Sequence, residues 1–82
     1  MGLKKLAAKV ADYKQRLEKG QTSEIKPDHV QKVLAKLEKK QVDLKARFDA
    51  ETDPGERERL TGKLGIAREQ IARARWLLDE LD

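Results

Sequence analysis

The sequence predicts an all-α fold, in which two long helices form an antiparallel, coiled-coil-like helical hairpin and a shorter N-terminal helix completes an up-down-up three-helix bundle. Three observations predict it. Apolar residues recur at alternating steps of three and four in three separate segments, which is the spacing of one helix face. Both prolines of the chain stand where a helix would begin. Charged residues make up 41% of the chain and aromatic residues 4%, a composition typical of long helices.

The first helix is expected over residues 2–19. Its apolar stripe consists of Leu3, Leu6, Val10, Tyr13 and Leu17. Gly20 follows at the position where a glycine in the left-handed conformation ends many helices. Residues 21–25 lack this periodicity and are expected to form a short polar connector.

The second helix is expected over residues 27–51, because proline is tolerated at the first helical position and Pro27 opens this segment. Its heptad seam consists of Val30, Leu34, Leu37, Gln41, Leu44 and Phe48. With Lys26 as N-cap, Ile25 and the first seam residue occupy the two positions of a hydrophobic staple. Gln41 is the polar member of the seam, and a buried polar residue there would fix the register of pairing.

The third helix is expected over residues 54–81. Asp53 as N-cap, Pro54 at the first helical position and Glu56 at the third form a variant of the capping box. Its seam consists of Leu60, Leu64, Ala67, Ile71, Ala74, Leu78 and Leu81. Because the preceding loop is short, this helix must lie antiparallel to the second one as its neighbour.

The registers of the two seams agree with this pairing. Folding the chain about residue 52 or 53 sets Leu44 near Leu60, Gln41 near Leu64 and Leu37 near Ala67, so that seam meets seam at every layer. The first helix would then lie back along the hairpin, and residues 1–82 would form a single small helical domain. A homodimer that forms through the first helix is the alternative architecture.

The residue types that carry most enzyme chemistry are scarce. The chain has no cysteine, a single histidine (His29) and a single serine (Ser23), and neither has a partner at a defined spacing. No acidic cluster has metal-ligand spacing, and no glycine-rich loop follows a strand. We therefore expect a protein that is not an enzyme and that binds no cofactor and no metal.

Membrane insertion is not expected either. No apolar run approaches the roughly 20 residues needed to cross a bilayer. The N-terminus also lacks the apolar segment of a signal peptide. A cytoplasmic location is therefore the expectation.

Basic residues follow two of the predicted helices. They are Lys5, Lys9 and Arg16 on the first helix and Lys32, Lys36, Lys39 and Lys40 on the second. Such stripes can track the phosphates of a nucleic acid, or they can form the solvated flank of a coiled coil. Residues 1–47 hold 13 Lys and Arg against 6 acids, whereas residues 48–82 hold 6 against 9, so the two parts can neutralise each other.

The back of the third helix carries Trp76, Leu77, Arg73 and Ile66, which the helical spacing places off the seam. Two interpretations stay open for Trp76. In one, the first helix covers its indole, with Arg73 stacked on the ring. In the other, these residues form an exposed patch of the types that dominate protein interfaces, and Gly62 and Gly65 allow a partner to approach closely.

Together these patterns predict a small non-enzymatic module for protein–protein interaction, such as an adaptor, inhibitor or regulator, that presents a rigid helical face. Its partner-binding residues would be Trp76, Leu77, Arg73 and Ile66. The alternative is a basic nucleic-acid-associated protein that uses the lysine stripes of the first two helices. A protein partner is expected in the first case, and self-association into a homo-oligomer is compatible with it.

Overall fold

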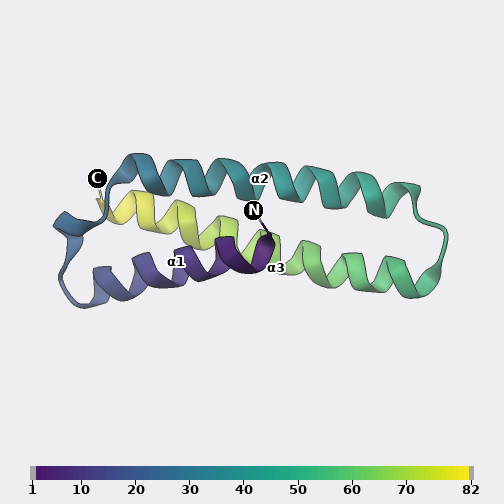
Figure 1. The fold of residues 1–82 in the computed structure, drawn as a ribbon, viewed down its shortest axis with the longest axis horizontal. Coiled ribbons are helices and arrows are strands. Elements are labelled where there is room, and N and C mark those ends of the chain that lie inside the picture. The colour runs from purple at the N-terminus through teal and green to yellow at the C-terminus, as the bar shows by residue number, and fades with distance from the viewer. Residues whose placement is uncertain (1, 82) are drawn as a thin grey trace.

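The structure, a computed structural model, describes residues 2–81. The described chain forms helix α1 (Leu3–Glu18), a short 3-10 turn η1 (Thr22–Glu24), helix α2 (Pro27–Ala50) and helix α3 (Pro54–Leu81), and it contains no strand. Helices α2 and α3 form a long antiparallel hairpin, and α1 lies along one half of it (Figure 1). The predicted all-α, up-down-up three-helix bundle is therefore confirmed.

Helix α1 ends where its glycine predicts. Gly20 has a φ of +76°, in the left-handed region that glycine adopts without strain. Its N–H donates to the carbonyl of Leu17 at 3.1 Å, and the N–H of Gln21 donates to the carbonyl of Arg16 at 2.9 Å. These two bonds are those of a Schellman motif, which satisfies the last carbonyls of the helix and turns the chain toward α2.

The start of α2 follows the predicted staple. Ile25 and Val30 are both buried, and they belong to the same apolar cluster. Lys26 is the N-cap and makes no side-chain capping bond. Its carbonyl accepts from the N–H of His29 at 2.9 Å, which begins the helix. Apolar contact therefore fixes the entry of this helix, and a polar cap contributes nothing.

The loop between α2 and α3 is held by two carboxylates rather than by the predicted capping box alone. Asp53 Oδ2 accepts from the N–H of Glu56 at 3.2 Å, as an N-cap should. The reciprocal bond to the N–H of Asp53 comes from Glu51 Oε1 at 3.0 Å, and not from the side chain of Glu56. Glu51 Oε1 also accepts from the N–H of Thr52 at 3.1 Å, so the turn is well satisfied on both sides.

The core has two parts along a molecule that measures 47 × 19 × 18 Å. In the half that α1 covers, the buried cluster consists of Leu6, Val10, Ile25, Val30, Val33, Leu37, Ile71, Ala74 and Leu77. In the other half it consists of Leu44, Leu60, Leu64 and Ala67, with Phe48 and Leu3 packed against it. The covered half is thus a three-helix core, and the other half is a two-helix core with an open face.

The predicted seam is displaced in the covered half. Leu34, Leu78 and Leu81 are only partly buried, whereas Val33 and Leu77, which lie off the predicted seam, are fully or nearly fully buried. The reason is that α2 and α3 each pack against α1 as well as against each other, so each buries two adjoining stripes. A seam derived from a hairpin alone misses the second stripe.

The buried polar residue is also a different one from that predicted. Gln41 is partly buried and lies beside Leu64 at the surface. Gln70 is 8% exposed, and its Oε1 has no hydrogen-bond partner. At 100° per residue, Gln70 lies about 20° from Leu77 around the axis of α3, on the buried stripe beside the predicted seam.

Two cations cover Phe48 near the end of α2. Arg57 lies over the ring at 4.3 Å from its centroid, and Lys45 lies over it at 5.3 Å. Arg57 also donates to the carbonyl of Glu51 at 3.4 Å, which ties the start of α3 to the loop. Cation–π contacts thus shield an aromatic ring in the half of the hairpin that α1 does not cover.

Candidate functional site

The four residues predicted to bind a partner do not form one surface. Trp76 is 43% exposed and Ile66 is 46% exposed, as expected for residues that lie off the seam. Leu77 is 0% exposed, so the prediction that it belongs to an exposed patch is wrong. Leu77 lies on the second buried stripe of α3, and it belongs to the same apolar cluster as Leu6 and Val10 of α1.

Trp76 lies at the junction of α1 and α3. Together with Lys14 of α1 and with Ala72 and Arg73 of α3, it lines a shallow hollow of about 300 Å³. Arg73 turns toward Glu69, and its Nη2 lies 2.6 Å from Glu69 Oε1. In the described chain the cation–π contacts fall on Phe48, so Arg73 does not stack on the indole. Helix α1 therefore borders the indole and leaves almost half of it open.

Ile66 is exposed for a different reason. At 100° per residue, Ile66 lies within about 40° of Gln70 and Leu77 around the helix axis, and those two residues are buried. Ile66 lies beside the first residues of α1, with Leu3 and Ala7 lining the same hollow. The stripe that α1 covers thus continues past the N-terminal end of α1, and Ile66 is the first of its residues to be uncovered.

Two adjoining hollows extend this stripe toward the loop. One has a volume of about 610 Å³ and the other about 370 Å³, and Lys63 lines both. We call them together the open groove. Its apolar lining consists of Leu3, Ala7, Ala50, Leu60 and Ile66, and its charged lining consists of Lys4, Lys40, Arg47, Glu51, Glu56, Arg59 and Lys63.

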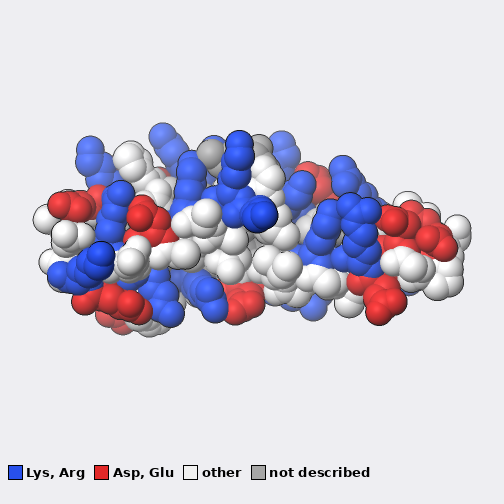
Figure 2. Space-filling model, turned by 60° about the horizontal axis from the view of Figure 1, so that its bottom comes forward, with Lys and Arg blue, Asp and Glu red and all other residues white. Residues whose placement is uncertain are grey.

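The charges of the open groove are mostly positive and mostly unpaired. Glu56 pairs with Arg59 at 3.6 Å, and the carboxylate of Glu51 accepts the two N–H bonds of the loop. No carboxylate within the described residues forms an ion pair with the other basic residues of the groove, which are Lys4, Lys40, Arg47 and Lys63. On the face drawn in Figure 2, basic side chains lie along most of the length of the molecule, and acidic side chains lie at both ends.

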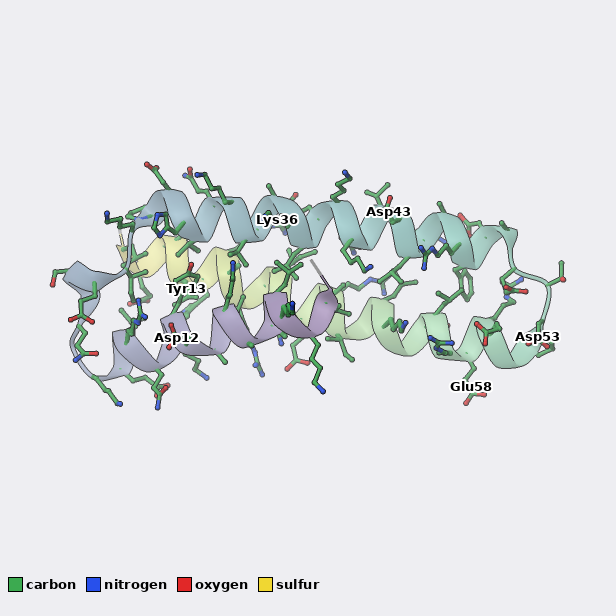
Figure 3. The ribbon with its side chains drawn as sticks, viewed as in Figure 1. Asp12, Tyr13, Lys36, Asp43, Asp53 and Glu58 are labelled. Atoms are coloured by element: carbon green, nitrogen blue, oxygen red, sulfur yellow. The ribbon has the colours of Figure 1, made fainter. Side chains whose placement is uncertain are left out.

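The residues predicted to bind a nucleic acid are only partly brought together. Lys36, Lys39 and Lys40 line a hollow of about 330 Å³ with Leu6 and Asp43. Figure 3 shows Lys36 on α2 above helix α1, and Asp43 farther along α2, beyond the N-terminal end of α1.

The other members of the predicted stripes lie outside that hollow. Arg16 pairs with Asp12 on its own helix at 3.1 Å, which engages its charge locally. Lys5 and Lys32 are exposed and Lys9 is partly buried, and none of the three lines the hollow. The structure therefore supplies a short basic cluster at the contact of α1 with α2 instead of two long stripes.

The opposite face of the hairpin was not singled out by the sequence. Val42 is 67% exposed and lines a hollow of about 260 Å³ with Gln41, Lys45, Leu64 and Arg68. Its position off the seam of α2 is the signal that could have found it. Apart from the backbone of α3 itself, no atom of the described chain comes within 4 Å of a Cβ built on Gly62 or Gly65, so the space beside both glycines is open.

His29 is exposed in the first turn of α2. No group of three or more His, Cys, Asp or Glu residues in this part of the chain could hold a metal ion. None of the described helices combines the length and the apolar character needed to cross a bilayer.

The structure thus divides the predicted surface into the open groove with Ile66, the hollow beside Trp76 and Arg73, and the core position of Leu77. The groove is the larger of the two exposed sites, and it combines an apolar floor with unpaired cations. The chain shows no match to a protein-family model, to a curated protein or to a solved structure.

Proposed function

We propose that this chain is a small non-enzymatic protein–protein interaction module whose open groove binds a helix of a partner protein. One observation carries the proposal: α1 fills the groove between α2 and α3 along one half of the hairpin, and the same groove runs on without a third helix in the other half. Ile66, 46% exposed, lies where the covering ends.

Helix α1 shows how a helix fits this groove. It buries Leu6 and Val10 against both α2 and α3, which is the packing that an apolar stripe at steps of three and four produces. Helix-in-groove recognition between proteins uses the same anchors. A partner helix would place its own stripe on Leu3 and Ile66, beside the small exposed part of Leu60.

The size of the groove suits a short helix. From Glu56 to Ile66 the groove follows α3 for about 15 Å at 1.5 Å per residue, which is nearly three helical turns. Trp76 and Arg73 remain a second, smaller contact surface near the other end of α3. Tryptophan and arginine are enriched at the energetic centres of interfaces, so this surface also supports a binding role.

The test compares two baits that carry the same change on opposite faces of the hairpin. Ile66→Glu places a charge on the floor of the groove, whereas Val42→Glu places one on the exposed opposite face. Partners captured from the source cell are quantified by mass spectrometry, and circular dichroism verifies that both variants remain helical. We expect Ile66→Glu to lose the partners that Val42→Glu and the unchanged chain retain. Equal capture by all three baits would rule the groove out.

The second candidate function is binding to a nucleic acid. The observation that favours it is the cluster of Lys36, Lys39 and Lys40, none of which forms an ion pair within the described chain. Phosphate contacts of this kind give an affinity that falls steeply with salt concentration. Titration of duplex DNA and of single-stranded RNA at low salt measures it. A micromolar affinity that Lys36→Gln weakens would support this function, and no binding at low salt would exclude it.

A further inference from the structure

We propose that the occupant of the open groove is an acidic amphipathic helix of a partner protein, with an apolar stripe flanked on both sides by Glu or Asp. This inference rests on the proposed function and names the chemistry of the partner. The groove supplies the reason, because its floor is apolar and its two walls carry cations that have no acidic partner in the described chain.

Three lysines from three different helices meet around the apolar floor. Lys4 of α1, Lys40 of α2 and Lys63 of α3 line the same hollow as Leu3 and Ile66. Lys40 and Lys63 are partly buried, as expected for lysines whose stems cover apolar surface. Three lysines around one hollow contribute charges of the same sign to it, and an anion bound there would lessen their mutual repulsion.

The two acids of the groove do not balance these lysines. Glu56 is paired with Arg59, and Glu51 caps the loop through its Oε1. Arg47, on the α2 side, adds a further cation with no ion-pair partner among residues 2–81. The charge that remains available to a ligand is therefore positive on both walls of the groove.

This arrangement defines the pattern of the occupant. Apolar residues at steps of three and four would contact Leu3, Leu60 and Ile66 along the floor. Acidic residues on one flank would face Lys63 of α3, and those on the other flank would face Lys40 and Arg47 of α2. A helix of three to four turns with this pattern covers the open face of the two-helix core.

Two other occupants fit less well. A second copy of the chain, seated groove to groove across a two-fold axis, would set two surfaces whose unpaired charges are positive against each other. A nucleic acid would match the lysines but would leave Leu60 and Ile66 facing phosphates, and no aromatic residue lines the groove as a stacking platform.

The experiment uses pairs of fluorescently labelled synthetic peptides of roughly 14 residues, about four turns of helix. Both members of a pair carry the same apolar stripe, and their flanks are Glu in one and Lys in the other. Binding to the full chain is measured by fluorescence anisotropy at low and at high salt, over several apolar stripes. We expect Glu-flanked peptides to bind, with an affinity that falls as salt rises, and Lys-flanked peptides not to bind.

Variants of the protein then locate the binding. Lys63→Glu and Lys40→Glu should each weaken the Glu-flanked peptide about tenfold, because an attraction becomes a repulsion. Lys32→Glu, an exposed lysine of α2 outside the groove, is the matched control and should leave the affinity unchanged. Circular dichroism verifies the fold, and Lys63→Gln provides a milder change should Lys63→Glu prove unstable.

Three results would overturn the inference. Equal binding of Glu-flanked and Lys-flanked peptides would show that charge does not select the occupant. The proposed binding function of the groove would still hold in that case if Ile66→Glu lost the partners that the unchanged chain captures. A concentration-dependent dimer in sedimentation experiments that Ile66→Glu abolishes would identify a second copy instead. If duplex DNA displaced the peptide, and Lys63→Glu weakened the binding of that DNA, the occupant would be a nucleic acid.

Discussion

At the scale of single residues, burial separates side chains that are adjacent in the sequence. Trp76 and Leu77 are neighbours, yet the indole is almost half exposed while Leu77 is 0% exposed under α1. Two glutamines that are far apart in the sequence also differ in burial. Gln41 is partly exposed at the surface, whereas Gln70 is buried and its Oε1 has no hydrogen-bond partner. For Trp76 and Leu77, the position of α1 around the hairpin makes the difference, because Leu77 belongs to the apolar cluster that contains Leu6 and Val10 of α1.

Replacing the two neighbours should therefore have unequal effects on stability. Leu77→Ala removes a fully buried side chain and should cost about 3 kcal/mol of unfolding free energy. Trp76→Ala should cost about 1 kcal/mol, because much of the indole already contacts water. Urea denaturation followed by circular dichroism at 222 nm measures both. Equal losses would mean that Trp76 is part of the core and is not available to a partner.

Gln70→Leu should stabilise the protein. The buried Oε1 without a partner carries a desolvation cost, and leucine fills a similar volume without it, so we expect a gain of about 1 kcal/mol. Gln41→Leu is the control, since a partly exposed amide hydrogen-bonds to water and should give little change. Thermal unfolding of both variants measures the difference. A destabilised Gln70→Leu would show that this amide has a partner that stabilises the fold.

At the scale of elements, local signals determine where each helix begins and ends. Pro27 and Pro54 open α2 and α3, and Gly20 follows the end of α1, so the observed helix bounds lie within one residue of the predicted ones. These signals act through the dihedral angles and hydrogen bonds of a few neighbouring residues, which makes them readable from sequence. The side chain that completes the cap at Asp53 was harder to assign, because Glu51 and Glu56 both lie within reach of the loop.

Two glycines should respond in opposite directions to the same substitution. Gly20→Ala places a side chain at φ +76° and should cost about 1 kcal/mol of unfolding free energy. Gly62→Ala lies inside α3 with nothing within 4 Å of the new Cβ, and should gain about 0.5–1 kcal/mol from helix propensity. Thermal unfolding of the two variants checks the signs. A loss at Gly62 would indicate that its backbone is closely approached.

At the scale of the whole molecule, the unequal lengths of the helices create the candidate site. Helix α1 has 16 residues, whereas α2 has 24 and α3 has 28, so one half of the hairpin is left without a third helix. The sequence predicted all three helices and their antiparallel order. It did not predict the burial of Val33 and Leu77 or the open groove, because both depend on where α1 docks around and along the hairpin.

The position of α1 is a tertiary property that no local pattern encodes. The stripe that α1 covers on α3 contains Gln70 and ends at Ile66, which does not read as a continuous apolar face. The sequence was enough to place Ile66 off the seam. That Ile66 lies at the end of a groove could be seen only in the folded structure. The three lysines around it come from three helices, so their meeting could not be read from spacing along any one of them.

The most direct test of the central claim is amide chemical-shift mapping by NMR, with the Glu-flanked peptide titrated into the labelled chain. We predict that the perturbed amides concentrate around the open groove, at the start of α1, near Lys40 and Arg47 on α2, and from Arg59 to Ile66 on α3. Amides near Val42 on the opposite face should remain unchanged. Perturbations gathered around Trp76 and Arg73, with the groove silent, would contradict the account.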